Sequence, residues 1–170
     1  MPGLYLLRHA SYDHRSGESD HERALDEQGT REAVRVGEHL RDLGARAQRV
    51  LCSSSRRALE TWSGLSSVWP VEVEVVVSDR LYLATPGEML EILRELPADV
   101  ETALVIAHNP GTQDLATALA GEGPGDDYHR MRSAYPTAAL CELAFDSPWS
   151  QLATGSARLV RFYTAPESTS

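Results

Sequence analysis

The sequence predicts a three-layer α/β sandwich, in which helices cover both faces of a mainly parallel central β-sheet. Up to about residue 119, short apolar runs typical of buried strands alternate with segments whose apolar residues recur at helical spacing. The later apolar segments 138–145 and 156–164 have no helix between them, so we expect them to be antiparallel. The 170 residues contain no linker and no internal repeat, and we expect a single domain over 1–170 with a frayed tail at 165–170.

The first predicted strand is the continuous apolar run 4–7, and a polar loop without periodicity follows over 11–23. A helix is expected next, because Asp26 can cap its N-terminus and Gly44 can end it. The buried face of this helix would carry residues at helical spacing, namely Ala33, Val36, Gly37, Leu40 and Leu43.

The apolar run 49–52 predicts the second strand. Ser55 then offers an N-cap to a second helix, with Ala58, Trp62 and Leu65 on one side. The segment 71–77 is rich in β-branched residues and predicts the third strand.

The sequence Thr85-Pro86-Gly87-Glu88 predicts the start of a third helix, because it combines a capping box with proline at the first helical position. A fourth buried strand is expected at 103–107, and a helix from Asn109 to about Leu119. The segment 121–135 has no periodicity and is expected to be a loop. Its residues Asp127, Tyr128 and Arg130 could cover a site, but an inert surface loop is favoured.

Composition and charge exclude several classes of function. Hydrophobic residues make up 42% of the chain and charged residues 24%, and no stretch approaches the roughly 20 apolar residues of a membrane span. Without a signal peptide, we expect a cytoplasmic protein with no membrane partner. The formal net charge of −9 argues against nucleic acid as a partner. Cys52 and Cys141 lie in apolar runs and are expected to be buried thiols rather than a disulfide.

Histidines and arginines follow three of the predicted strands. Arg8 and His9 come after the first strand, Arg56 and Arg57 after the second, and His108 after the fourth. Sites of parallel α/β sheets form beyond the carboxyl ends of the strands, so we expect these side chains to converge on one edge. A single histidine at a strand end is more often structural, whereas two such histidines accompanied by arginines favour a function.

This cluster suits phosphoryl chemistry. All 16 basic residues are arginine, whose planar fork matches the oxygens of a phosphoryl group. The helix that begins near Ser55 adds backbone N–H donors at the same place. Arg8 and Arg57 should lower the pKa of His9 and keep its ring neutral, as an attacking nitrogen requires.

Three motifs in order resemble those of the histidine phosphatase (phosphoglycerate mutase-like) superfamily. Leu7-Arg8-His9-Ala10 resembles its Arg-His-Gly signature, with Ala10 in place of the usual glycine. The stretch 53–61, Ser-Ser-Ser-Arg-Arg-Ala-Leu-Glu-Thr, resembles its Ser-Pro-x-x-Arg-Ala-x-Gln-Thr motif, and 105–110 is similar to the motif around its second histidine. The SixA-type phosphohistidine phosphatase branch is suggested by Asp20-x-x-Arg23-x-Leu25, Leu81-Tyr82 and Pro136-Thr137-Ala138.

The resemblance covers nearly the whole chain and implies a phosphoglycerate mutase-like fold and a phosphatase that uses neither a metal ion nor a cofactor. It implies that His9 becomes the phosphohistidine intermediate, that Arg8 and Arg57 hold the phosphoryl oxygens, and that His108 donates to them. Arg23 is either a further substrate ligand or a solvated surface residue. The implied substrate is a protein phosphohistidine, and the alternative is a small phosphate monoester.

The position of a general acid departs from the family pattern. Many members carry this acid as the Glu of a Leu-x-Glu, where Leu81-Tyr82-Leu83 places Leu83. Asp79 and Glu88 lie nearby but out of register. A missing acid fits a phosphoramidate substrate, because a protonated phosphohistidine departs as neutral imidazole, whereas an alkoxide needs a proton donor.

Other readings explain the sequence less well. A cysteine-dependent phosphatase needs five residues between cysteine and arginine, but Cys52 is followed by three before Arg56 and four before Arg57. A metallohydrolase would need ligand spacing that the loop residues Asp13, His14, Asp20 and His21 lack. A mutase would need inserted segments for which the chain has no room. A non-catalytic phosphoprotein-binding module stays open as an alternative, although both candidate catalytic histidines are present.

Overall fold

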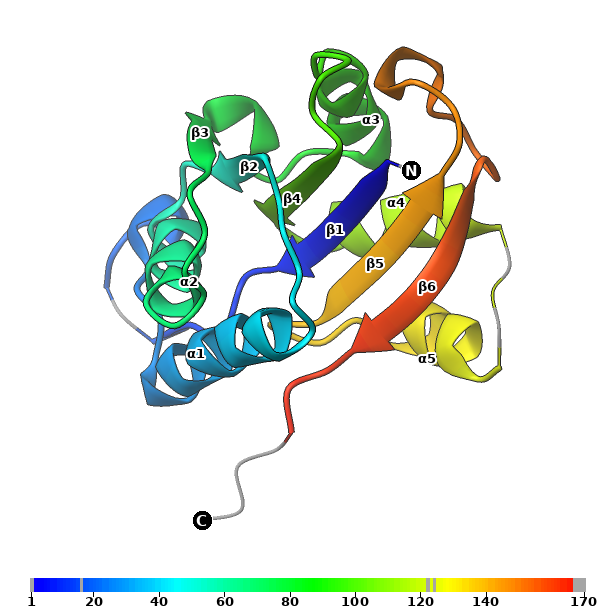
Figure 1. The fold of residues 1–170 in the computed structure, drawn as a ribbon. Coiled ribbons are helices and arrows are strands. Elements are labelled where there is room, and N and C mark those ends of the chain that lie inside the picture. The colour runs from blue at the N-terminus through cyan, green and yellow to red at the C-terminus, as the bar shows by residue number, and fades with distance from the viewer. Residues whose placement is uncertain (1, 16, 122, 124, 167–170) are drawn as a thin grey trace.

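The computed structural model describes residues 2–15, 17–121, 123 and 125–166, and within them six strands form one sheet (Figure 1). The strands are β1 (Gly3–Arg8), β2 (Arg49–Ser53), β3 (Glu74–Ser78), β4 (Thr102–Ala107), β5 (Leu140–Phe145) and β6 (Ala157–Tyr163). Their order across the sheet is β3-β2-β4-β1-β5-β6. The first four in this order are parallel to one another, while β5 is antiparallel to β1 and β6 to β5. The predicted mainly parallel sheet with a late antiparallel pair is confirmed.

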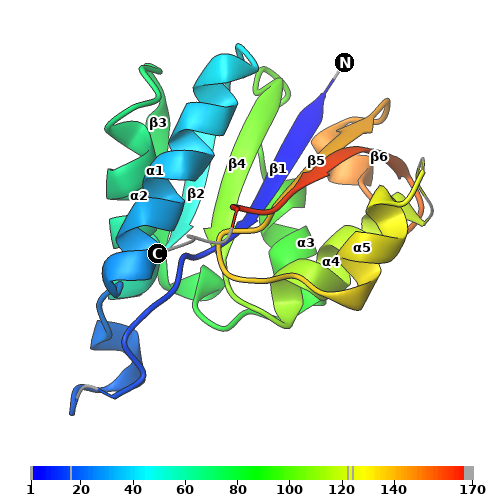
Figure 2. The ribbon, with the colours of Figure 1, turned by 90° about the horizontal axis from the view of Figure 1, so that it is seen from below.

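Helices cover both faces of the sheet, as the view in Figure 2 makes plain. The helices are α1 (Glu27–Asp42), α2 (Arg56–Ser66), α3 (Pro86–Arg94), α4 (Gly111–Ala120) and α5 (Asp127–Ser133). Short 3-10 turns occur at η1 (Asp20–Glu22), η2 (Asp79–Leu81) and η3 (Trp149–Gln151). Helices α1 and α2 lie on one face, and α3, α4 and α5 on the other. The three-layer α/β sandwich is therefore the fold of this chain.

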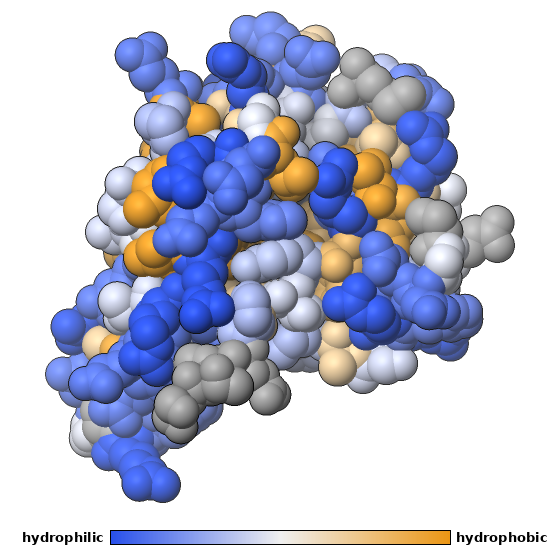
Figure 3. Space-filling model, turned by 60° about the horizontal axis from the view of Figure 1, so that its bottom comes forward, coloured by the Kyte–Doolittle hydropathy of each residue, from blue (hydrophilic) through white to orange (hydrophobic). Residues whose placement is uncertain are grey.

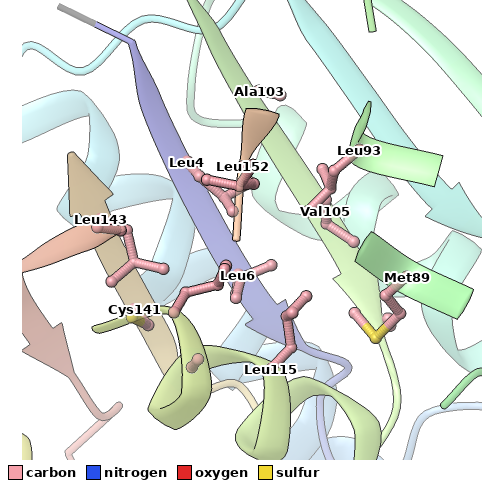
Figure 4. Close-up of a cluster of buried hydrophobic side chains, with 14 of the residues drawn as sticks. Leu4, Leu6, Met89, Leu93, Ala103, Val105, Leu115, Cys141, Leu143 and Leu152 are labelled. Carbon is pink, nitrogen blue, oxygen red and sulfur yellow. The ribbon is translucent and has the colours of Figure 1, made fainter. Parts of the chain in front are cut away.

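Two apolar clusters hold the layers together, because side chains alternate across the sheet. Leu4 and Leu6 of β1 point into the cluster under α3 and α4, where Figure 4 shows them with Leu115 and Met89. Tyr5 and Leu7 point the other way, into the cluster formed with α1 and α2. Continuous burial on both faces explains why the run 4–7 is apolar throughout.

The predicted starts of α1, α2 and α3 are confirmed by their caps, whereas α4, expected from Asn109, begins at Gly111 without a side-chain cap. The Asp26 carboxylate accepts a hydrogen bond from the Gly29 backbone N–H at 2.7 Å and so begins α1. Thr85 and Glu88 exchange side-chain and backbone hydrogen bonds at the start of α3, which is the predicted capping box.

Two elements differ from the prediction. Strand β3 begins at Glu74 rather than at Val71, because its partner β2 starts at Arg49, which pairs with Glu74. The segment 121–135, expected to be a loop, contains helix α5. The tail expected to fray is 165–170, and its residues 167–170 lie outside the described residues.

The surface has small, separate apolar areas on the side shown in Figure 3, where hydrophilic side chains dominate. In the part of the chain that the structure describes, no helix is long and apolar enough to cross a membrane. A hollow of about 490 Å³ lies between α1, α5 and the residues that follow β6. Its walls contain none of the five candidate site residues.

Candidate active site

His9 and His108 lie side by side because β1 and β4 are neighbouring parallel strands in register. Arg8 pairs with Ala107 at the end of this ladder, and the His9 backbone N–H donates to the Ala107 carbonyl at 3.1 Å. The next residue of each strand is a histidine, and the two ring centroids are 5.0 Å apart. Both residues are buried, with exposed fractions of 3% and 2%.

The hydrogen bonds of His9 assign its tautomer. Its Nδ1 lies 2.9 Å from the Ala10 carbonyl oxygen, which can only accept, so Nδ1 carries the hydrogen. Nε2 then holds a lone pair, and the Arg57 Nε–H faces it at 3.4 Å. The Ala10 backbone N–H donates to Thr61 Oγ1 at 2.9 Å, which ties the turn after His9 to α2. His9 therefore directs a fixed lone pair at a guanidinium group.

Arg57 occupies the centre of the cluster. It is the second residue of α2, whose N-cap Ser55 accepts a hydrogen bond from a backbone N–H of the first turn. Its side chain is only 3% exposed. Besides its contact with His9, NH2 lies 3.4 Å from His108 Nδ1. On the other side, NH1 donates to the Asp20 carbonyl at 2.6 Å and NH2 to Asp20 Oδ2 at 3.1 Å.

His108 is held between Arg57 and Ser53. Because a guanidinium only donates, His108 Nδ1 is the acceptor of that contact, and Nε2 carries the hydrogen toward Ser53 Oγ at 2.8 Å. Ser53 is the last residue of β2 and is fully buried. Three neighbouring elements, β2, α2 and β4, thus fix the ring.

Burial keeps both histidines neutral. It is the largest cause that lowers the pKa of His9 to about 3, and the charges of the neighbouring arginines add to it. The pKa of His108 falls to about 4, first through burial and then through the Arg57 charge. The pKa of His9 is lowered as expected from Arg8 and Arg57, but burial contributes more than either arginine.

The two remaining candidate arginines lie differently. Arg8 donates from NH1 to the Tyr135 carbonyl at 3.0 Å, and its buried Nε has no hydrogen-bond partner among the described residues. Its charge acts on both histidines, which places it beside the cluster. Arg23 donates to the Asp13 carbonyl at 3.2 Å and, within the described chain, bonds to none of the other four candidates.

The position expected for a general acid holds no acid. Leu83 is 55% exposed and has a positive φ of 52°. Glu88 is engaged in the capping box with Thr85, and Asp79 begins the turn η2. The described contacts link neither carboxylate to the histidines.

Two side chains at the site were not predicted. Asp20 contacts Arg57, and its Oδ2 also accepts a hydrogen bond from the Tyr82 hydroxyl. This bond is the largest cause that lowers the pKa of Asp20, and Arg57 adds to it. The Tyr82 ring lies edge-on to His108, with centroids 5.4 Å apart. The only sequence signal for Tyr82 was its place one residue before Leu83, where the family pattern has an acid.

A cysteine nucleophile finds little support at this site. Cys52 and Cys141 are free, buried thiols, as predicted, and burial raises the pKa of Cys52 to about 12, which opposes a thiolate nucleophile. Within the described ranges, no group of three or more His, Cys, Asp or Glu side chains is placed to hold a metal ion.

A buried, neutral imidazole aimed at a guanidinium, at the carboxyl edge of a parallel sheet, has the form of a phosphoryl-transfer site. Comparisons agree with this class. Residues 4–139 match the profile of the histidine phosphatase superfamily (branch 1). An uncharacterized protein of Mycobacterium leprae (strain TN) is 32% identical over 162 residues, covering 92% of this chain and 98% of its own.

Solved structures of histidine phosphatases have the same fold as this chain. A candidate phosphohistidine phosphatase SixA from Nakamurella multipartitia has a TM-score of 0.85 at 26% identity, with 96% of each chain covered. Its counterpart from Agrobacterium tumefaciens has a TM-score of 0.82 at 26% identity, with 96% of this chain and 99% of that one covered. The chain belongs to the histidine phosphatase superfamily, in its SixA-type branch. It is accordingly a phosphatase with a histidine nucleophile.

Proposed function

We propose that the protein removes phosphoryl groups from protein phosphohistidine, without a metal ion, through a phosphoryl group held transiently on His9. The observation that carries the proposal is the fixed, neutral Nε2 of His9 facing the Arg57 guanidinium at 3.4 Å. The two SixA structures described above support the choice of phosphohistidine as substrate.

In the first step, the phosphoryl group enters between the two histidines and Arg57. The His9 Nε2 lone pair forms a bond to phosphorus, and the bond from phosphorus to the substrate nitrogen breaks with its electron pair. Arg57 and Arg8 neutralise the charge on the phosphoryl oxygens in the transition state. The His9 Nδ1–H stays on the Ala10 carbonyl, which stabilises the positive ring that forms.

His108 assists as a hydrogen-bond donor to the phosphoryl group. Burial and the Arg57 charge lower its pKa, and a nearby anionic phosphoryl group favours the protonated ring. Nδ1, which accepts a hydrogen bond from Arg57 in this structure, can then donate to a phosphoryl oxygen. Water attacks phosphorus in the second step, and the bond from phosphorus to His9 Nε2 breaks with its electron pair. His9 leaves as neutral imidazole, and both water protons depart with inorganic phosphate.

The leaving group favours phosphohistidine over an alkyl phosphate. With Leu83 at the acid position, an alkoxide would have to leave without a proton donor. Arg23 stays a proposed substrate ligand on the loop that precedes α1. We place the activity in the cytoplasm, with neither a membrane nor a nucleic acid as partner.

Rapid quenching with a radiolabelled phosphohistidine protein tests the intermediate. We expect a label on the enzyme that is lost in acid and survives base, as a phosphoramidate does. His9→Ala should abolish both label and turnover, whereas His108→Ala should slow turnover and retain label. His129→Ala, an exposed histidine of α5, is the matched control and should behave as wild type. A label that survives acid, or one that persists in His9→Ala, would assign the nucleophile to another residue.

A further inference from the structure

A carboxylate stands at the outer side of this cationic site. The Asp20 side chain is 47% exposed, whereas the Arg57 side chain is 3% exposed. His9 is buried like Arg57 and contacts its Nε, while Asp20 contacts its NH1 and NH2. The loop that carries Asp20 is anchored, because the neighbouring His21 Nε2 lies 3.0 Å from Ser54 Oγ. Asp20 is therefore a positioned part of the site wall.

Asp20 can keep this position while phosphate is bound. The Arg57 contacts to the two histidines are long, at 3.4 Å each, whereas those to Asp20 are 2.6 Å and 3.1 Å. An entering phosphoryl group would displace the long contacts first. The guanidinium has further N–H groups for the phosphoryl oxygens.

The charge of Asp20 is unexpected for a phosphate site. Hydrogen bonds from Tyr82 and Arg57 lower its pKa, so the carboxylate is ionised at neutral pH. An anion here repels a phosphoryl group and cannot donate a proton to a leaving alkoxide. It would be favourable only if the leaving group itself presented a hydrogen-bond donor. Asp20 Oδ1 is free to accept one, since within the described chain the carboxylate bonds only through Oδ2.

We propose that Asp20 selects N-phosphorylated substrates by accepting a hydrogen bond from the ring N–H of the leaving imidazole. This role rests on the proposed phosphohistidine phosphatase activity and adds a specificity-determining residue to it. In-line attack places the leaving group on the side of phosphorus opposite His9 Nε2, which is the outer side where Asp20 lies.

The transfer balances as an exchange between two imidazoles. The substrate enters as a phosphoimidazolium with a proton on its second nitrogen. His9 Nε2 forms the new P–N bond, and the old P–N bond gives its electron pair to the substrate ring, which leaves neutral with its N–H on Asp20. His9 becomes the phosphoimidazolium, with its Nδ1–H on the Ala10 carbonyl. Asp20 thus accepts the ring N–H of the substrate, as the Ala10 carbonyl accepts the Nδ1–H of His9. The negative charge of Asp20 favours the protonated phosphoimidazolium, from which the imidazole leaves easily.

Tyr82 is a positioning residue for this carboxylate. Its hydroxyl donates to Oδ2, which leaves Oδ1 as the open acceptor. Its ring also lies edge-on to His21, with centroids 4.8 Å apart. Loss of the hydroxyl should therefore weaken the selection without removing the charge.

The test compares kcat/KM for three phosphoryl donors in wild type and Asp20→Asn. The first donor is phosphohistidine. The second is its analogue methylated on the second ring nitrogen, which keeps the positive charge but lacks the N–H. The third is p-nitrophenyl phosphate, whose leaving group needs no proton. A hydrogen bond to a charged group corresponds to roughly a tenfold to hundredfold effect. We expect Asp20→Asn to lower kcat/KM by this factor for phosphohistidine only, and Tyr82→Phe to lower it by less. For p-nitrophenyl phosphate, kcat/KM of Asp20→Asn should be unchanged or higher.

The control variant is Glu18→Gln, which removes an exposed carboxylate that lies on the same loop and contacts Arg56 rather than the site, and it should leave all ratios unchanged. An equal loss on all three donors would assign Asp20 to holding Arg57 and overturn the proposal, as would no change on any donor. A wild-type enzyme that prefers the ester would instead refute the phosphohistidine activity itself. A preference for phosphohistidine that survives Asp20→Asn would refute only the role of Asp20.

Discussion

Acid should destabilise this protein through two buried histidines, His9 and His108. In the unfolded chain both rings titrate near pH 6.5, whereas in the folded protein the pKa of His9 is about 3 and that of His108 about 4. The unfolded state therefore binds more protons as the pH falls below 6.5, and stability is lost over that range. Each histidine contributes a slope of roughly 1.4 kcal/mol per pH unit, so the pair should remove roughly 5 kcal/mol between pH 7 and pH 4.5.

Urea unfolding followed by tryptophan fluorescence at pH 7, 5.5 and 4.5 measures this loss, since Trp69 and Trp149 are buried in the two clusters. His9→Gln removes one titrating ring and should remove about half of the pair's pH dependence. His129→Gln, an exposed histidine, should not alter it. Burial also lowers the pKa of His39, so His39 adds to the loss of stability in acid. This contribution is the same in all variants, and the difference between variants therefore isolates His9. If the slope of unfolding free energy against pH is unchanged in His9→Gln, the His9 ring is not held neutral by burial, and the prediction is wrong.

Two further predictions concern the chemistry and the packing. Chelators should leave activity intact while vanadate, an oxyanion that mimics the transferring group, should inhibit it; activity lost to a chelator and restored by a divalent ion would overturn the metal-free mechanism. Gly37→Ala should lower the free energy of unfolding by about 1–3 kcal/mol in thermal or urea melts, because a Cβ there would lie 2.3 Å from the Leu65 carbonyl oxygen and push α1 from α2. Gly87→Ala, where a Cβ meets nothing within 4 Å, is the helical control and should be neutral or slightly stabilising, so an equal loss in both variants would contradict the packing argument.

The fold was predictable from the sequence where periodicity and capping agreed. Asp26, Ser55 and Thr85 each mark a helix start that the structure contains, because an N-cap is a local hydrogen bond between residues three apart. Helix α5 was missed because it has seven residues and buries only Met131, which is too little for a recognisable period. The start of β3 was missed because a strand can begin only where its partner offers backbone groups to pair with.

The site was predictable in part for the same reason. The placement of His9, Arg57 and His108 follows from the ends of predicted strands and one helix, so their convergence depends only on topology. Asp20 reaches Arg57 through a loop without periodicity, and no sequence pattern fixes where such a loop folds back. Tyr82 is aimed by the turn η2 after β3, which is equally invisible before the structure is known.

The geometry of His9, the proposed nucleophile, depends on the backbone ladder more than on any one side chain. His9 is fixed by the pairing of β1 with β4 on one side and by the Ala138 backbone N–H on the other, which donates to the carbonyls of Arg8 and His9 at 3.1 Å and 3.0 Å. A slip of one residue in the β1 register would turn the His9 side chain to the opposite face of the sheet. Burial of the β1 side chains opposes that slip. Leu4 and Leu6 are buried in one cluster and Tyr5 and Leu7 in the other, and a slip of one residue would move each pair to the wrong face of the sheet. The apolar core therefore positions His9, the proposed nucleophile, through the register. Substitutions that preserve the size and pattern of these residues should for this reason leave the geometry of His9 intact.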